Sequence, residues 1–170
     1  MDLPVEPADR EWLRLDARVI ELDRTVGLMV TAVLALGLFL GAVIVWLVPE
    51  APRPLKYLAV PAWLAVALGL GALSYWWPPL DYRHAAYRIG AEGIEIRRGV
   101  LWRTLISVPR SRVQHIDVAQ GPLERRFGLG TLSIYTAGTQ HSRVDLRGID
   151  YATALALRDR LLPAGSPDAL

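Results

Sequence analysis

The chain has 170 residues, of which 52% are hydrophobic, a formal net charge of +2 and no cysteine. The length leaves room for one domain and a modest additional element, and the lack of cysteine excludes disulfides, thiolate metal sites and cysteine nucleophiles. The charge is uneven, because residues 1–25 hold four arginines and seven acids, whereas residues 81–170 hold thirteen arginines and nine acids. The basic excess therefore lies in the C-terminal part of the chain.

Two uncharged apolar runs predict membrane-spanning helices over residues 26–48 and 57–77, which together form a segment from 26 to 77. At about 1.5 Å per residue, each run is long enough to cross a hydrocarbon core about 30 Å thick. A cleaved signal peptide is disfavoured for the first run, since its apolar region usually has only about 7–15 residues. We expect the second helix to end at Pro78 and Pro79, which lack the N–H groups that continue a helix.

The orientation of this pair of helices follows from the charges around it. Only about eight residues separate the two runs, so we expect an antiparallel hairpin with both chain ends on one side of the membrane. Seven arginines flank the outer ends of the hairpin, against Arg53 and Lys56 in the loop, and basic flanks face the cytoplasm. The prediction is a multi-pass plasma-membrane protein with both termini cytoplasmic. Neither run holds an ionisable side chain, so the hairpin is interpreted as an anchor in the lipid bilayer.

Small residues recur at four-residue spacing in both runs, where they allow helices to approach closely: Gly37, Gly41, Ala65 and Gly69. This spacing fits packing within the hairpin and, as the alternative, contacts between molecules in a homo-oligomer. The cytoplasmic segment 1–25 contains a stretch from Asp9 to Arg24 with apolar residues at approximately helical spacing. It predicts an amphipathic helix that either lies along the membrane surface or covers the following domain.

Residues 81–163 form the predicted cytoplasmic domain, followed by a flexible tail over residues 164–170. Short alternating segments separated by turn residues predict six strands: Tyr82–Ile89, Ile94–Arg98, Leu101–Val108, Val113–Val118, Leu132–Thr136 and Arg143–Leu146. Trp102, Thr104, Ile106 and Val108 are expected on one face of the third. Asp150 is a plausible N-cap of a C-terminal helix that ends near Pro163. The fold class is thus an α+β membrane protein, with a compact β-barrel or sandwich capped by a helix.

Several short motifs make the central segment specific: Val108-Pro109, Arg112-Val113-Gln114, Gly121-Pro122-Leu123, Arg126-Phe127-Gly128-Leu129, Leu132-Ser133-Ile134, Thr136-Ala137-Gly138 and Leu146-Arg147-Gly148-Ile149. In these motifs the domain resembles the bacterial pleckstrin-homology-like (PH-like) domain-2 family. With the two apolar runs upstream, the chain resembles the short two-span membrane proteins of the YdbS type. The resemblance implies a PH-like fold and this membrane topology, and it suggests a larger membrane protein with related PH-like domains as the partner.

No pattern in the sequence indicates catalysis, a metal site or a cofactor. His84, His115 and His141 are far apart, and none has a carboxylate or histidine at metal-ligand spacing. Gly128 and Gly130 precede a strand rather than a helix, so a tight turn is a better interpretation than a phosphate-binding loop. We therefore expect a protein that is not an enzyme.

The candidate lipid-binding or partner-binding residues are seven arginines: Arg97, Arg98, Arg103, Arg110, Arg112, Arg125 and Arg126. Near an anionic leaflet each contributes about 1 kcal/mol of attraction. One hypothesis is a membrane-anchored interaction module that binds a partner membrane protein. The alternative is a sensor of anionic lipid headgroups, and the sequence leaves open whether the arginines form a defined pocket. Nucleic-acid binding is disfavoured, because no recognition helix or stacking motif accompanies the charge.

Overall fold

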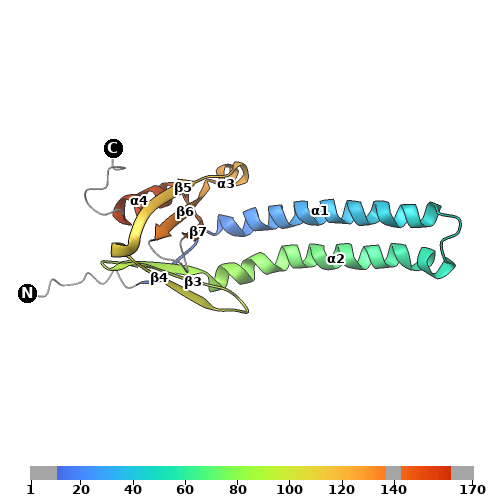
Figure 1. The fold of residues 1–170 in the computed structure, drawn as a ribbon, viewed down its shortest axis with the longest axis horizontal. Helices are drawn as coiled ribbons and strands as arrows, with labels where there is room; N and C mark the ends of the chain where they lie inside the picture. The colour runs from blue at the N-terminus through green and yellow to red at the C-terminus, as the bar shows by residue number, and fades with distance from the viewer. Residues whose placement is uncertain (1–10, 137–142, 162–170) are drawn as a thin grey trace, which may run out of the picture. The chain divides into compact units, whose positions relative to one another are not determined.

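The computed structural model describes residues 11–136 and 143–161, and these fall into two compact units (Figure 1). One unit is Asp23–Pro79, and the other combines the described residues up to Leu22 with those from Leu80 onward. The predicted loop at 137–142, which includes His141, and the predicted tail at 164–170 lie outside the described residues, as do the first residues of the predicted amphipathic segment. We describe the two units separately.

The first unit is a pair of long apolar helices. Helices α1 (Arg18–Leu47) and α2 (Arg53–His84) are both long and apolar enough to cross a membrane, as the two runs predict. Most of their large hydrophobic side chains are exposed, which suits a lipid environment. Polar groups pair between the helices: the hydroxyls of Thr31 and Ser74 lie 2.9 Å apart, and the Trp63 indole donates to the Ala35 carbonyl at 2.7 Å. These bonds join the helices.

Helix α2 does not end at Pro78 and Pro79 but continues to His84, so the predicted end is wrong. The fixed φ of proline is compatible with a helix, and its main cost is the lost N–H donor. Pro79 leaves the Tyr75 carbonyl without its usual partner four residues on. Arg24 of α1 donates from Nε to that carbonyl at 3.0 Å, and its guanidinium lies 4.1 Å from the centre of the Tyr75 ring. Arg24 thus compensates for part of the cost of the prolines.

The small residues predicted to bring the helices together do not mark their closest approach. A Cβ added at Gly37, Gly41 or Gly69 would meet nothing within 4 Å, and Ala65 is exposed. The close contact is at Gly27, where an added Cβ would lie 3.0 Å from the Ser74 Cβ. Among the glycines of the hairpin, the tightest contact between the helices is thus at Gly27 opposite Ser74, and a packing role for the predicted small residues stays a prediction.

The second unit is a sandwich of two antiparallel sheets. The first sheet has the order β1 (Leu13–Arg14), β2 (Ala86–Gly90), β3 (Gly93–Arg98) and β4 (Thr104–Pro109), and the second has the order β5 (Val113–Ala119), β6 (Leu129–Thr136) and β7 (Arg143–Asp150). A 3-10 turn, η2 (Arg110–Arg112), joins the sheets, and helices α3 (Pro122–Phe127) and α4 (Tyr151–Leu161) complete the unit. The sheets do not close into a barrel, so the α+β class is confirmed in its sandwich form.

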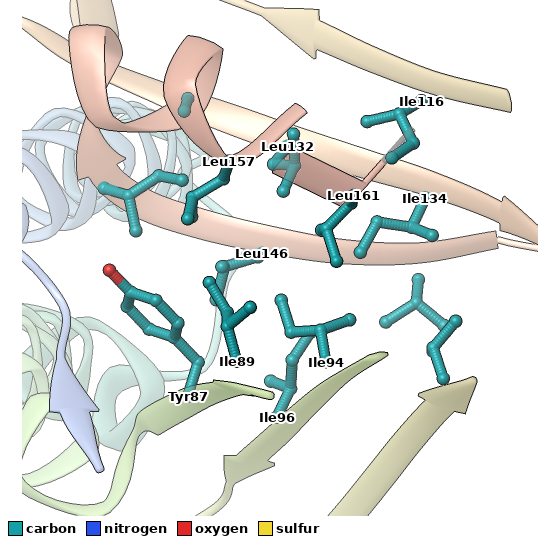
Figure 2. Close-up of a cluster of buried hydrophobic side chains, with 14 of the residues drawn as sticks. Tyr87, Ile89, Ile94, Ile96, Ile116, Leu132, Ile134, Leu146, Leu157 and Leu161 are labelled. Carbon is teal, nitrogen blue, oxygen red and sulfur yellow. The ribbon is translucent and has the colours of Figure 1, made fainter. Parts of the chain in front are cut away.

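The core lies between the two sheets and under α4. Figure 2 shows Ile89, Ile94 and Ile96 of the first sheet pointing toward side chains of the second sheet and α4. In β3 the alternate residues Ile94 and Ile96 are buried, whereas all residues of β6 from Leu129 to Ile134 are buried. Each fully buried aliphatic side chain contributes about 1.5–3 kcal/mol. The predicted cap of α4 is confirmed, because Asp150 Oδ2 accepts the N–H groups of Ala152 (3.1 Å) and Thr153 (3.3 Å).

The N-terminal segment is part of the sandwich rather than one amphipathic helix, so that prediction is wrong over residues 11–17. Leu13 pairs with Tyr87 of β2, and the helix begins only at Arg18. From Arg18 onward the segment is helical, and the alternative in which it covers the domain is confirmed, because Val19 and Leu22 pack on Leu129. The membrane hairpin is consequently inserted between the first two strands of the domain.

Several predicted strand boundaries also differ from the structure. Strand β6 begins at Leu129 rather than Leu132, and β7 ends at Asp150 rather than Leu146. The first predicted strand began at Tyr82, but residues up to His84 continue α2, and β2 begins at Ala86. The third was predicted from Leu101, yet β4 begins at Thr104, and Trp102 lies exposed in the loop before it. The alternation that includes Trp102 is therefore not a buried face.

Candidate functional site

The structure separates the seven predicted arginines into three groups. Arg97 and Arg98 belong to β3, with Arg103 in the loop that follows; Arg110 and Arg112 form the ends of η2; Arg125 and Arg126 lie in the last turn of α3. In the β3–β4 pairing, Arg97 lies opposite Leu105, whereas Gly93 lies opposite Pro109. Because Arg110 follows Pro109, the first two groups are more than four residues apart along the sheet, which is more than about 13 Å at 3.3 Å per residue.

The first group gains two residues, an arginine and a histidine, that the sequence did not assign to it. Arg83 and His84 at the end of α2 line one small cavity of about 210 Å³ together with Arg97, Gly99 and Arg103. The His84 Nδ1 lies 2.8 Å from the Leu80 carbonyl. Among the described residues, none of the three arginines has an acidic partner. A cavity with this lining attracts anions.

Arg97 is held in place by an aromatic residue from the N-terminal segment. The Trp12 ring has the guanidinium of Arg97 at 4.8 Å and that of Arg88 at 4.9 Å, both within the range of cation–π attraction. Arg88 also pairs with Glu95, whereas Arg97 keeps an exposed guanidinium. Trp12 thus orients one cation of the basic cavity. Sequence analysis missed this role because Trp12 is more than seventy residues away in the chain.

The second group is not part of a basic cavity. The Arg110 N–H donates to the Glu92 carbonyl at 2.7 Å, which ties η2 to the β2–β3 turn. A larger cavity of about 590 Å³ lies at that end of the sheet, and its lining includes Arg88, Glu92 and Glu95. Its charges are mixed, so it lacks the preference for anions expected of the first group.

The third group lies on a helix that was not predicted. Glu124 accepts the Gly121 N–H and the Thr131 hydroxyl, each at 2.7 Å, and so fixes α3 at its first turn. Gly128 ends the helix with φ +67°, consistent with the predicted tight turn. Arg125 and Arg126 are exposed. The signal for α3 was present as a proline at the first helical position and a glutamate two residues later.

A separate set of charges ties the N-terminal segment to the domain. Arg18 pairs with Asp16 (2.7 Å) and Asp150 (2.8 Å) and donates to the Phe127 carbonyl at 3.1 Å. The bond from Arg18 is the main reason that the pKa of Asp150 is lowered, with help from the Thr153 N–H. The same guanidinium lowers the pKa of Asp16. Because these groups satisfy one another, they are structural and not a ligand site.

The histidines considered in the sequence analysis form no metal-binding cluster in the part of the chain that the structure describes. His84 lies at the basic cavity, and His115 lies on β5 beside Asp117, with its Nε2 2.6 Å from a carboxylate oxygen. Within residues 11–136 and 143–161 no three histidine or acidic side chains are grouped as metal ligands.

Two membrane-length helices combined with a PH-like sandwich define a membrane protein that carries a bacterial PH-like domain. The sequence profile described as "Bacterial PH domain" matches residues 18–164, and the chain belongs to this family. It is 32% identical over 111 residues to the UPF0699 transmembrane protein YdbS of Bacillus subtilis (strain 168), covering 62% of this chain and 68% of that protein. No solved structure matches the chain significantly. These similarities confirm the resemblance and the location in a membrane, and neither description names an enzymatic activity.

Proposed function

We propose that the protein is a non-enzymatic interaction module, fixed by its helical hairpin at the inner face of the plasma membrane, whose PH-like domain binds a partner membrane protein. The observation that carries this proposal is the free edge of the first sheet. Strand β4 is the last strand of that sheet, and among the described residues it pairs only with β3.

The side chains of β4 suit this role. Val108 is buried in the core, whereas Leu105 is 61% exposed and Ser107 is exposed. An exposed edge strand offers backbone N–H and C=O groups to an extended segment of another chain, and side chains on one face add specificity. A partner with a related PH-like domain, or a second copy of this chain, has strands of the same kind.

Crosslinking in cells tests the proposal. A photoreactive residue at Ser107 is expected to capture a membrane protein, whereas one at Ala156, exposed on α4, is not. Leu105→Lys, which places a charge on the edge, is expected to abolish the adduct, and Ala156→Lys is the matched control. An adduct of twice the chain's mass identifies a second copy as the partner. No adduct, or the same adduct from both positions, contradicts binding at the β4 edge.

A second candidate function is a sensor of anionic lipid headgroups. It is favoured by the basic cavity lined by Arg83, Arg97 and Arg103, because Arg83 lies in the last turn of the second membrane helix. Near a negatively charged leaflet such a cavity attracts headgroup phosphates. In nanodiscs that contain phosphatidylglycerol, the lipid headgroups should then protect these arginines of the full-length protein from a guanidine-modifying reagent. Equal modification in pure phosphatidylcholine contradicts this function.

A further inference from the structure

The loop between β3 and β4 is short and apolar at its tip. Leu101 is 76% exposed and Trp102 is 87% exposed. Gly99 begins the turn with φ +106°, and a Cβ there would lie 1.9 Å from the Trp102 carbonyl oxygen. Only glycine fits that position, so the backbone holds the two apolar side chains away from the core.

Cations surround this tip. Arg98 precedes the loop and Arg103 ends it; both are exposed, and neither has an acidic partner among the described residues. Arg103 also lines the basic cavity. A tryptophan and a leucine between arginines match the composition of segments that lie at a membrane interface, where aromatic rings sit at headgroup level and arginines meet phosphates.

The position of the tip within the domain favours lipid as its occupant. Arg83 and His84 line the same cavity as Gly99 and Arg103, so the tip lies at the end of the domain where the chain arrives from the hairpin. Arg83 follows Pro79 by four residues, or about 6 Å of helix at 1.5 Å per residue. Only this short stretch of chain separates the cavity residue Arg83 from the membrane-spanning part of α2.

We propose that the Gly99–Arg103 tip inserts Leu101 and Trp102 into the interface of the leaflet that anchors the domain, with Arg98 and Arg103 bound to phosphates of anionic lipids. The occupant is the bilayer itself. This contact would give the domain a third point of attachment besides the two helices and fix which of its faces is turned toward the cytoplasm. The inference rests on the membrane attachment in the proposed function and not on the protein partner.

Fluorescence in nanodiscs tests insertion, since a chain without cysteine accepts single labels. Leu101→Cys carries an environment-sensitive dye, and Glu92→Cys, at the opposite end of β3, is the matched control. We expect the dye at 101 to be quenched by nitroxides attached high on the lipid acyl chains, and the dye at 92 to be quenched only by a water-soluble reagent. Trp102→Ser should weaken the lipid quenching. The proposal is overturned if the dye at 101 behaves like the one at 92. It is also overturned if the dye at 101 is shielded from water but not quenched by the lipid nitroxides, since that result indicates a protein occupant.

A second experiment varies the charge of the lipids. Replacing phosphatidylcholine by a mixture with phosphatidylglycerol should increase the fraction of inserted tips. Arg98→Gln or Arg103→Gln should each lower the ratio of inserted to free tips about fivefold, which corresponds to about 1 kcal/mol per arginine. Arg158→Gln on α4 is the control. Insertion that is the same in both lipids and in all variants overturns the role of the arginines. Crosslinking from Ser107 is read independently, so failure of the tip and failure of the partner proposal are distinguishable.

Discussion

Gly148 is the position at which a small change should detach the N-terminal segment from the domain. It is the extra residue of a bulge in β7, since Gly130 pairs with Ile149 and the next pair is Thr131 with Arg147. Its φ is +75°, and its carbonyl accepts the N–H of Asp16 at 2.9 Å. The bulge thus forms the docking point for the chain that leads into the first membrane helix.

The cost of Gly148→Ala follows from two separate effects. A left-handed backbone costs an alanine about 1–2 kcal/mol. The new Cβ would also lie 2.5 Å from Val19 Cγ2 and 2.9 Å from Val19 Cβ, and overpacking of this kind costs about 1–3 kcal/mol. The docked state should therefore lose about 2–5 kcal/mol, and its equilibrium with the undocked state should shift by about thirtyfold or more.

Hydrogen exchange of the full chain in nanodiscs measures this shift. In Gly148→Ala we expect faster exchange in a peptide covering residues 11–22 and in β7. Gly69→Ala is a matched control, because its Cβ meets open space. Val19→Ala deletes the closest atom, so Gly148→Ala should cost about 1 kcal/mol less in that background. Unchanged exchange in Gly148→Ala, or a cost that is the same with and without Val19→Ala, would refute the reasoning.

Three further outcomes are expected. The pKa of Asp16 is lowered by Arg18, so the ionised Asp16 carboxylate stabilises docking at neutral pH. This stabilisation should be lost as the pH falls below about 3.8, and Arg18→Gln should remove the pH dependence in the same exchange experiment. Arg24→Gln should increase amide exchange around the double proline of α2, because a carbonyl loses its donor; normal exchange there would contradict the compensation. Thr31→Val should lower the thermal stability of the hairpin in detergent by about 0.6–2 kcal/mol, since Ser74 loses its partner, and an unchanged melting temperature would show that the bond adds nothing.

The sequence was informative wherever one physical signal dominated. Long uncharged runs predicted both membrane helices, and alternation placed Ile94 and Ile96 in the core. Asp150 was recognisable as a cap because its side chain precedes a helical pattern. These features depend on local composition and periodicity, which a single sequence displays directly.

The remaining features depend on contacts between distant residues. Strand β1 has only two residues, and it exists because Leu13 and Arg14 meet β2 across an inserted membrane hairpin. Where helix α2 passes two prolines, Arg24 of α1 supplies a donor to a carbonyl that lost its own. The basic cavity likewise combines Arg83 with Arg103 from a separate loop. The structure therefore brings Arg97 and Arg103 together with Arg83, which the sequence analysis did not single out.

Topology mapping tests the central claim, a PH-like domain held at the inner face of the plasma membrane, most directly. The chain lacks cysteine, so Ala51→Cys in the loop between the helices and Glu92→Cys in the domain each provide a single thiol. A membrane-impermeant maleimide added to intact cells should label residue 51 and should reach residue 92 only after the membrane is permeabilised. Labelling of residue 92 in intact cells, with residue 51 protected, would contradict the account.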